Sequence, residues 1–447
     1  MGEAMKENRS MQLSIAIKEL MDQDLSGIFY EYYPFDILDK YKNNNERDRV
    51  YNQSNTMLTM IITMLHTDKS LQNSVNIYNM IHNKNRARIT EIEGSYEQSK
   101  KKEEKRERGR PVKHILKVQK SKKEEISMNT SAYTQARQRL NIEFPRAVFS
   151  SSIQTEEQLE PTKFYGREVF ISDGTYLQLQ DSELIRREYQ SSTVEGYPRG
   201  LLEVILQQGT GLITDFEIQS DKKSELELLI PMINGIKSGS LLLADDLYNC
   251  FAIFAIMKKQ CVDIIVPGKR KRKYKVINQI SQGDEIVIIP NTKEKSKMIA
   301  KFEIEDKSIE MRRIQVPNPN DEKEDIVLYT SLLDKKISKE EILLKYLTRW
   351  DIEISIREIK AILEMNVIRG KSPEMIKKEV TAGLIAYNYI RRIIAKSAQN
   401  GNFPPETDIF QKFYQTSTTV LLDKLGRVYS RWSPGRYGGT GKSNITT

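Results

Sequence analysis

A continuous apolar run, Leu241-Leu242-Leu243-Ala244, constrains the fold of this chain more than any other sequence feature. An unbroken run of this kind is expected of a strand that is buried on both faces of a sheet, where alternation of apolar and polar residues is not needed. A sheet covered on both faces is typical of α/β proteins. The run leads directly into Asp245, so this strand is also expected to deliver a carboxylate to the edge of the sheet.

Strand and helix patterns alternate around this run. Three strand patterns precede it, and Gln208-Gly209-Thr210-Gly211 forms a predicted turn between the second and the third. The order β-β-β-α-β-α-β predicts an α/β core with a mixed sheet. The predicted strands are Val169–Ile171 (leading to Asp173), Leu201–Leu206, Leu212–Ile218, Leu241–Ala244 and Val262–Val266, and the helices are Ser224–Ile236 and Tyr248–Lys259.

The flanking regions have different patterns, and the length of 447 residues suits two to four domains. Short strands are predicted at Glu285–Ile289, Lys301–Ile304, Met311–Val316 and Ile326–Thr330, and long helices at Ser338 to about Leu363 and Met375 to about Ala398. The predicted organisation is a helical N-terminal region (1–95) that is a candidate for DNA-end binding, a basic linker or arm (96–130), the first part of the core (131–267), a β-rich insertion (268–332), the second part of the core (333–400) and a basic C-terminal tail (401–447).

The positive charge is concentrated in one segment. Lys100 to Lys123 contains twelve Lys or Arg and three Glu, which equals the net charge of +9 of the whole chain. This segment predicts a polyanionic partner such as DNA, with a solvated spacer as the alternative. A second basic cluster, Lys269-Arg270-Lys271-Arg272-Lys273, is predicted to follow the DNA backbone, with a solvated surface as the alternative.

Composition excludes several other classes of protein. No run of about 18 apolar residues is present, and the N-terminus has no secretory pattern, so neither a membrane span nor export is expected. Cys250 and Cys261 are predicted to be buried thiols in a reducing compartment. The three His residues are scattered, so any metal is expected to be Mg²⁺ or Mn²⁺ bound by carboxylates.

Two aspartates follow central strand patterns. Asp173 ends one strand and Asp245 another, and neighbouring strands lie about 4.8 Å apart, so the two carboxylates could share one or two cations. Asp173-Gly174 taken alone also fits a plain turn. Asp246, pointing to the opposite side of an extended chain, is the weaker candidate.

A polar stripe on the predicted long helix adds a third carboxylate. Tyr346, Arg349, Glu353 and Lys360 share an arc of about 60° on an ideal helix. Arg349 and Glu353 are four residues apart, so a simple surface ion pair is the alternative. Arg349 and Lys360 suit phosphate oxygens, and Glu353 suits a cation.

The spacing of this stripe, Tyr-x2-Arg-x3-Glu-x6-Lys, resembles the signature of the insertion-sequence-4 family of DDE transposases. Ile171-Ser172-Asp173-Gly174-Thr175 resembles the family's first-Asp segment, and Leu243-Ala244-Asp245-Asp246-Leu247-Tyr248 resembles its second, although Asp246 and Leu247 replace an Arg and a Gly. Ala386-Tyr387-Asn388-Tyr389-Ile390-Arg391 fits the family downstream. The resemblance covers residues 165 to 395.

The resemblance implies a ribonuclease-H-like fold with a β-rich insertion before the Glu. It implies that Asp173, Asp245 and Glu353 bind two Mg²⁺ ions, for which Mn²⁺ can substitute, and that Tyr346, Arg349 and Lys360 contact DNA. The expected activity is cut-and-paste transposition of an insertion sequence in the cytoplasm of a prokaryote, at the nucleoid. The expected partners are terminal inverted repeats, target DNA and a second copy of the chain in a synaptic complex. The alternatives are a nuclease of the same fold that only cleaves, and a catalytically inactive DNA-binding protein.

Overall fold

The computed structural model describes residues 50–64, 68–76, 78–79, 128–153, 161–189, 196–268, 272–292, 297–318, 321–362 and 368–400. The N-terminal 49 residues, the basic segment Lys100–Lys123 and the tail 401–447 therefore lie outside the described residues. No helix in the described part of the chain is long and apolar enough to cross a membrane.

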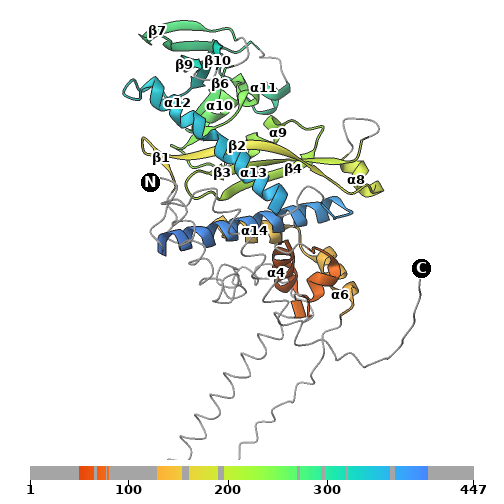
Figure 1. The fold of residues 1–447 in the computed structure, drawn as a ribbon. Helices are drawn as coiled ribbons and strands as arrows, with labels where there is room; N and C mark the ends of the chain where they lie inside the picture. The colour runs from red at the N-terminus through yellow and green to blue at the C-terminus, as the bar shows by residue number, and fades with distance from the viewer. Residues whose placement is uncertain are drawn as a thin grey trace, which may run out of the picture.

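A ten-stranded mixed sheet forms the centre of the described structure (Figure 1). Its order is β4-β3-β2-β5-β6-β10-β9-β8-β7, with β1 paired to β2. β3 runs antiparallel to β2 and β4 antiparallel to β3, whereas β5 and β6 run parallel to β2. The predicted mixed sheet is thus confirmed. The strands are β1 Lys163–Phe164, β2 Arg167–Gln178, β3 Arg199–Gln207, β4 Ile213–Ser220, β5 Leu241–Leu243, β6 Asp263–Pro267, β7 Lys275–Ser281, β8 Asp284–Pro290, β9 Ser308–Asn318 and β10 Asp321–Thr330.

Helices cover both faces of the central strands (Figure 1). Along β5, Leu241 and Leu243 belong to one apolar core, while Leu242 belongs to a second core on the opposite face. The first core packs against α7, α13 and α14, and the second against α9 and α10. The helices are α4 Gln53–Met64, α6 Thr130–Arg139, α7 Glu143–Ile153, α8 Glu183–Glu188, α9 Glu225–Ile233, α10 Phe251–Lys259, α11 Lys297–Lys301, α12 Lys339–Leu347, α13 Asp351–Ile362 and α14 Pro373–Asn400, with 3₁₀ turns η2 Asp246–Tyr248 and η3 Thr348–Trp350.

The predicted turn between β3 and β4 is present, and glycine is required there. Gly209 and Gly211 have φ angles of +92° and +69°, which side chains other than hydrogen rarely tolerate. A Cβ on Gly211 would lie 2.1 Å from Nη2 of Arg391 on α14. The side chain of Asn388 on the same helix bonds the backbone of Ile213 at 2.9 Å in both directions. Together these contacts attach α14 to the end of the β3–β4 hairpin.

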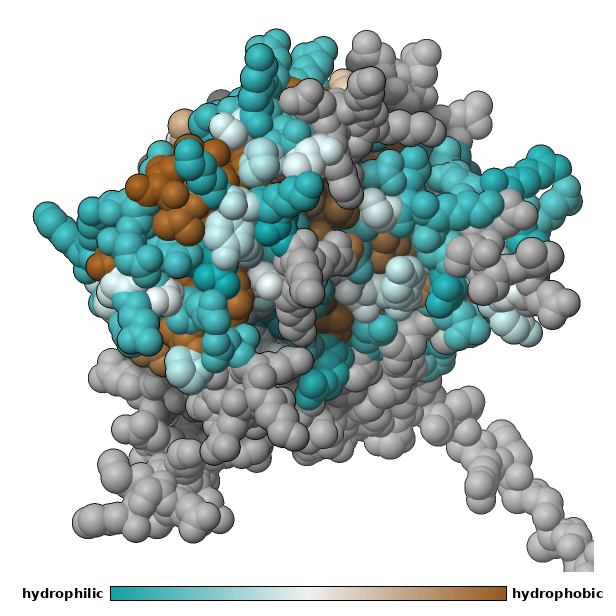
Figure 2. Space-filling model, turned by 90° about the horizontal axis from the view of Figure 1, so that it is seen from above, coloured by the Kyte–Doolittle hydropathy of each residue, from teal (hydrophilic) through white to brown (hydrophobic). Residues whose placement is uncertain are grey.

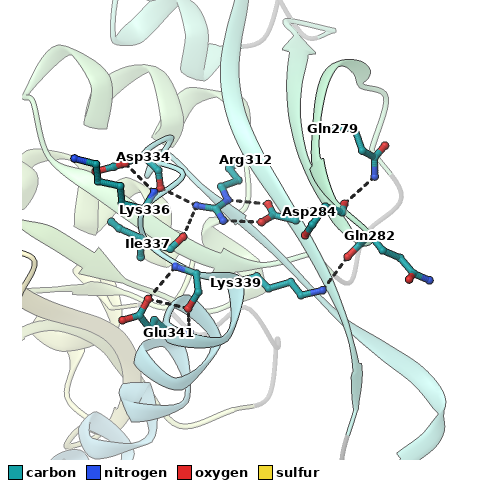
Figure 3. A network of polar contacts seen from close by, with 11 residues as sticks. Gln279, Gln282, Asp284, Arg312, Asp334, Lys336, Ile337, Lys339 and Glu341 are labelled. Atoms are coloured by element: carbon teal, nitrogen blue, oxygen red, sulfur yellow. Dashed lines mark hydrogen bonds and ion pairs between the residues drawn. The ribbon is translucent and has the colours of Figure 1, made fainter.

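The β-rich insertion continues the central sheet through β10, which pairs antiparallel with β6. Arg312 on β9, only 1% exposed, donates to both oxygens of Asp284 on β8 at 2.8 and 2.6 Å. It also donates to the carbonyls of Asp334 and Ile337 at 3.0 and 2.9 Å, just before α12 (Figure 3). Because α12 leads into η3 and α13, this buried network connects the insertion to the segment that carries Glu353.

Two sequence predictions in this region are wrong. Lys301–Ile304 is not a strand: α11 ends at Lys301, and a turn follows in which Glu303 has a φ of +51°. Phe302 and Ile304 are half-buried and pack against the core beside α9 and α10, so their apolar alternation comes from a turn with one side against the core. Cys261 is exposed rather than buried, since it lies in the turn after α10 with a φ of +54°.

The surface seen from above the insertion is mainly hydrophilic (Figure 2). Apolar patches interrupt it, and the described residues of β7 are among the exposed segments, with Val276 42% and Ile277 46% exposed. β7 is the outer strand of the sheet, pairing only with β8 among the described strands.

Candidate active site

Asp173 lies in the middle of β2, beyond the point where its parallel partner ends. The pairing of β2 with β5 stops at Ile171 opposite Leu243, while the pairing with β3 continues through Asp173 opposite Val204 to Gln178. The strand therefore does not end at Asp173, and the turn alternative for Asp173-Gly174 is wrong. Asp173 instead lies at an open edge of β2, because the neighbouring strand β5 ends before it.

Asp245 occupies the corresponding place after β5. Two residues beyond the Ile171–Leu243 pair, the register brings Asp173 and Asp245 to the same edge of the sheet. The backbone of Asp245 is still extended, and its Oδ1 accepts a hydrogen bond from the N–H of Leu247 at 2.8 Å as the N-cap of η2. Asp245 acts electrostatically on Asp173 and Asp246 on Arg272, and both act on Tyr346. The structure thus places Asp245 rather than Asp246 beside Asp173.

Glu353 is held by Arg349 one helical turn earlier. Nη2 of Arg349 donates to Oε1 of Glu353 at 3.0 Å, and the Arg349 side chain also hydrogen-bonds Tyr346. The Arg349 side chain is 10% exposed and that of Glu353 35%, so this pair is partly buried rather than a simple surface pair. The Nε of Arg349 is buried without a hydrogen-bond partner. An unsatisfied N–H in a buried position is rare in proteins, which marks the surroundings of Arg349 as unusual.

The predicted long helix is not continuous. α12 ends at Leu347, the 3₁₀ turn η3 carries Arg349, and α13 begins at Asp351. The hydroxyl of Thr348 donates to the carbonyl of Lys345 at 2.6 Å, which competes with the regular helical pattern at this point. The 3₁₀ turn advances about 120° per residue instead of 100°, yet Tyr346, Arg349 and Glu353 remain in contact across it.

Lys360, at the other end of the stripe, contacts the strand that carries Asp173. Its Nζ donates to Oγ1 of Thr175 at 3.1 Å. Thr175 is two residues after Asp173 and therefore lies on the same face of β2. α13 packs on β2, so Glu353 and Lys360 lie on the face of the sheet that presents Asp173.

The carboxylates at this edge influence one another. Burial raises the pKa of Asp173 from its ordinary value of 3.8 to about 6; the Gly174 N–H and Arg349 lower it, and the charges of Asp245 and Glu353 raise it. Burial, together with Asp173 and Asp245, raises the pKa of Glu225 to about 7. These carboxylates therefore concentrate negative charge at the site, and the nearby basic side chains balance it only in part.

The chemistry of these side chains fits a hard divalent cation. All donors are carboxylate oxygens, which Mg²⁺ and Mn²⁺ prefer. In the described part of the chain, no three His, Cys, Asp or Glu side chains already converge as a complete metal-binding group. Glu353 is instead hydrogen-bonded to Arg349. Metal-ligating and catalytic contacts are often longer before ligands bind.

The raised pKa of Asp173 predicts a pH-dependent stability of the metal-free protein. Because the folded-state pKa lies above the unfolded value, the ionised carboxylate costs stability above pH 6, and the cost disappears as the pH falls towards 3.8. In EDTA at pH 7.5, Asp173→Asn should raise the free energy of unfolding by on the order of 2 kcal/mol. Denaturant titration at pH 7.5 and 5 should show the difference from wild type shrinking at the lower pH.

Asp181→Asn is the control for this measurement. Asp181 is exposed, and its hydrogen bond from Arg186 lowers its pKa, so removing its charge should not stabilise the protein at either pH. Equal stability of wild type and Asp173→Asn at pH 7.5 would contradict the buried, charge-crowded environment of Asp173.

The second basic cluster is only partly described. Lys269, Arg270 and Lys271 lie outside the described residues, and Lys273 is exposed. Arg272 donates to both the carbonyl and the side-chain oxygen of Asn249 and stacks on the rings of Phe254 and Tyr329, at 4.9 and 5.7 Å from their centroids. Its guanidinium is therefore engaged within the protein, and contact of this cluster with DNA stays a prediction.

Three residues near the site were missed by sequence reasoning: Glu203, Glu225 and Tyr248. Glu203 interrupts the apolar pattern of β3 and is fully buried, and a charged residue inside an apolar strand is itself a signal of function. Glu225 begins α9, after the N-cap Ser224. The hydroxyl of Tyr248 donates to Oε1 of Glu203 at 2.6 Å.

Known proteins are similar to this chain over most of the residues that form the sheet and the candidate site. The family described as "Transposase DDE domain" matches residues 164–389, just over half of the chain. The transposase InsG of insertion sequence element IS4, from Escherichia coli strain K12, is 25% identical over 280 residues, which cover 60% of this chain and 62% of InsG. The match thus spans about three fifths of this relative's length.

Two further similarities are weaker. The putative transposase InsL of insertion sequence element IS186A, from the same organism, is 34% identical over 82 residues, covering 18% of this chain and 21% of InsL. The piggyBac transposase in a synaptic complex with hairpin DNA aligns with 97% of this chain and 87% of its own, at 8% identity and a TM-score of 0.41.

Proposed function

Because this chain belongs to the family of transposases with a DDE domain, we propose that it cleaves DNA phosphodiesters at the ends of an insertion sequence and joins those ends to target DNA. The observation that carries the proposal is the meeting of Asp173 and Asp245 at one edge of the sheet, on the face where α13 presents Glu353. These residues match the two Asp segments and the signature Glu of the family that the sequence resembles.

The core strands support a ribonuclease-H-like catalytic fold. Three antiparallel strands, β2 to β4, are followed by β5 and β6 parallel to β2, and the carboxylates lie where the first and fourth of these strands meet. Within this proposal, residues 131–267 and 333–400 form the two parts of the core and 268–332 the β-rich insertion. The helical region 1–95 takes the role of binding transposon ends.

The proposed mechanism assigns distinct tasks to the side chains. Asp173, Asp245 and Glu353 would hold two Mg²⁺ ions, with Mn²⁺ as a substitute; when bound, the ions supply activation of the attacking oxygen and stabilisation of the leaving one. Arg349, which lies beside Glu353, would donate to a phosphate oxygen, while Tyr346 orients the guanidinium. Lys360, beside Thr175, supplies a second positive charge near Asp173.

The proposed partners are double-stranded DNA and a second copy of the chain. Terminal inverted repeats and target DNA would both enter the site, and a homodimer would hold two ends in one synaptic complex. The segment Lys100–Lys123, with its net charge of +9, and the cluster Lys269–Lys273 are the proposed contacts with the phosphate backbone. The proposed location is the cytoplasm of a prokaryote, at the nucleoid.

Cleavage and joining assays test this function directly. Purified protein, Mg²⁺ and a linear duplex that carries the ends of the parent element should release the ends and insert them into a supercoiled plasmid. A duplex with scrambled ends is the matched control and should remain intact. Cleavage of both duplexes without joined products would favour a nuclease, and end binding without cleavage would favour an inactive DNA-binding protein.

A further inference from the structure

Glu225 fills the space that the absence of a side chain at Gly174 leaves beside β2. A Cβ added to Gly174 would lie 2.6 Å from both Cγ and Cδ of Glu225, closer than a Cβ can approach another side chain. The side chain of Glu225 therefore lies directly against β2, next to the residue that follows Asp173. Gly174 and Asp173 point to opposite faces of the strand, so Glu225 approaches from the α9 side and Glu353 from the α13 side.

The start of α9 directs Glu225 to this position. Ser224 is the N-cap, and its side chain and that of Glu227 form a reciprocal capping box. The cap therefore uses Glu227, which leaves Glu225 outside the capping arrangement. Glu225 instead interacts with the charges of Asp173 and Asp245, a costly arrangement for three carboxylates unless a cation joins them.

A buried network behind Glu225 provides a second, independent observation. Glu203 is 0% exposed, and its Oε1 accepts from Ser172 at 2.5 Å and from Tyr248 at 2.6 Å. Its Oε2 has no hydrogen-bond partner, although such a group is expensive to bury. Glu203 pairs with Gly174 in the β2–β3 register, and the Tyr248 hydroxyl also reaches Oε2 of Glu225 at 3.5 Å.

We propose that Glu225 is a fourth carboxylate of the cation site, and that Tyr248, held by Glu203, positions it. The proposal rests on the function proposed above, because it needs a divalent cation at Asp173 and Asp245. It extends the site from the α13 face of the sheet to the α9 face. In this proposal, Gly174 leaves the space in which the fourth carboxylate lies.

Binding of Mn²⁺ to the DNA-free, full-length protein tests the role of Glu225 without any activity measurement. Free Mn²⁺ is measured by electron paramagnetic resonance for wild type, Glu225→Gln, Glu227→Gln and Asp173→Asn. Glu225→Gln should weaken Mn²⁺ binding by about tenfold or more, as should Asp173→Asn. Glu227→Gln removes the same charge from the same helical turn and retains the cap, so it should bind as wild type does.

The outcomes separate this proposal from the proposed function. Wild-type affinity in Glu225→Gln together with a loss in Asp173→Asn would overturn the role of Glu225 and leave the proposed function intact. Wild-type affinity in both variants would remove the cation site, and the inference would fail with it. Glu225→Asp, which shortens the side chain but keeps its charge, should bind Mn²⁺ with intermediate affinity.

A double-mutant cycle tests the positioning role of Tyr248. Tyr248→Phe retains the buried ring and removes only the hydroxyl, and it should weaken Mn²⁺ binding severalfold. If Tyr248 acts through Glu225, the double variant Glu225→Gln/Tyr248→Phe should bind no more weakly than Glu225→Gln alone. Losses that multiply in the double variant would assign Tyr248 a purely structural role and remove it from the proposal.

Discussion

Replacing Asp173, Asp245 or Glu353 by alanine is expected to reduce DNA end cleavage by at least about 1000-fold in each case. Divalent cations contribute several kcal/mol to transition-state stabilisation in phosphoryl transfer, and each 1.4 kcal/mol corresponds to tenfold in rate. Asp173 and Asp245 meet at the open end of β5, and Glu353 lies on α13, which packs on β2, so each variant removes one of the proposed ligands.

The alanine variants should still bind DNA ends, because the substitutions remove ligands of the cation and leave the basic surfaces unchanged. Cleavage is measured on a duplex with the element's ends and binding by fluorescence anisotropy in EDTA. Asp246→Ala is the matched comparison, since Asp246 adjoins Asp245 but acts on Arg272 and Tyr346 rather than on Asp173, and it should retain far more cleavage than Asp245→Ala. An inactive Asp246→Ala beside an active Asp245→Ala would move the assignment by one residue.

Replacing Arg349 or Lys360 by alanine is expected to reduce cleavage or joining by about 10- to 100-fold without a loss of Mg²⁺ binding. Charge-assisted hydrogen bonds are worth about 1.5–3 kcal/mol each. Arg349 lies beside Glu353, and Lys360 lies beside Thr175 near Asp173, so both cations are placed near the proposed cation ligands, where a phosphate would bind. Arg349→Lys should recover only part of the loss, because an ammonium cannot make the paired contact.

The control for these variants is Arg357→Ala, on the same helix as Lys360. Arg357 is exposed, so its removal should leave cleavage and joining near the wild-type rate. Thermal melts of each variant separate a loss of contact with DNA from a loss of fold. If Arg349→Ala and Lys360→Ala were as active as Arg357→Ala, their contacts would be structural ion pairing alone, and a generic nuclease would become the better interpretation.

Local patterns in the sequence predicted most of the core. The continuous run at Leu241 became β5, buried on both faces, and the order β-β-β-α-β-α-β matches β2 to β6 with α9 and α10. Apolar periodicity predicts these elements because the residues that a central strand or helix buries recur at regular spacing within a short stretch of sequence. It failed at Lys301–Ile304, where a half-buried turn shows the alternation of apolar and polar residues that is typical of a strand.

The stripe on the helix illustrates both the strength and the limit of local reasoning. Tyr346, Arg349 and Glu353 are close in sequence, so their contacts were predictable from helical spacing and are present. The interruption at η3 was not predictable, because it depends on a side-chain hydrogen bond from Thr348 and on how α12 is held by the Arg312 network. The three residues of η3 add a rotation of about 60°, yet the long side chains of Tyr346, Arg349 and Glu353 still reach one another across it.

The sequence by itself determined the types of residue at the site, their local spacing and the class of the fold, since each of these depends on neighbours within a few positions. Only the tertiary structure decided which carboxylates meet. Asp173 and Asp245 are far apart in the chain and come together through the register of β2 with β5, and Glu225 approaches the neighbouring Gly174 from the opposite face. Register and close approach are set by packing between distant segments, about which a local pattern carries no information.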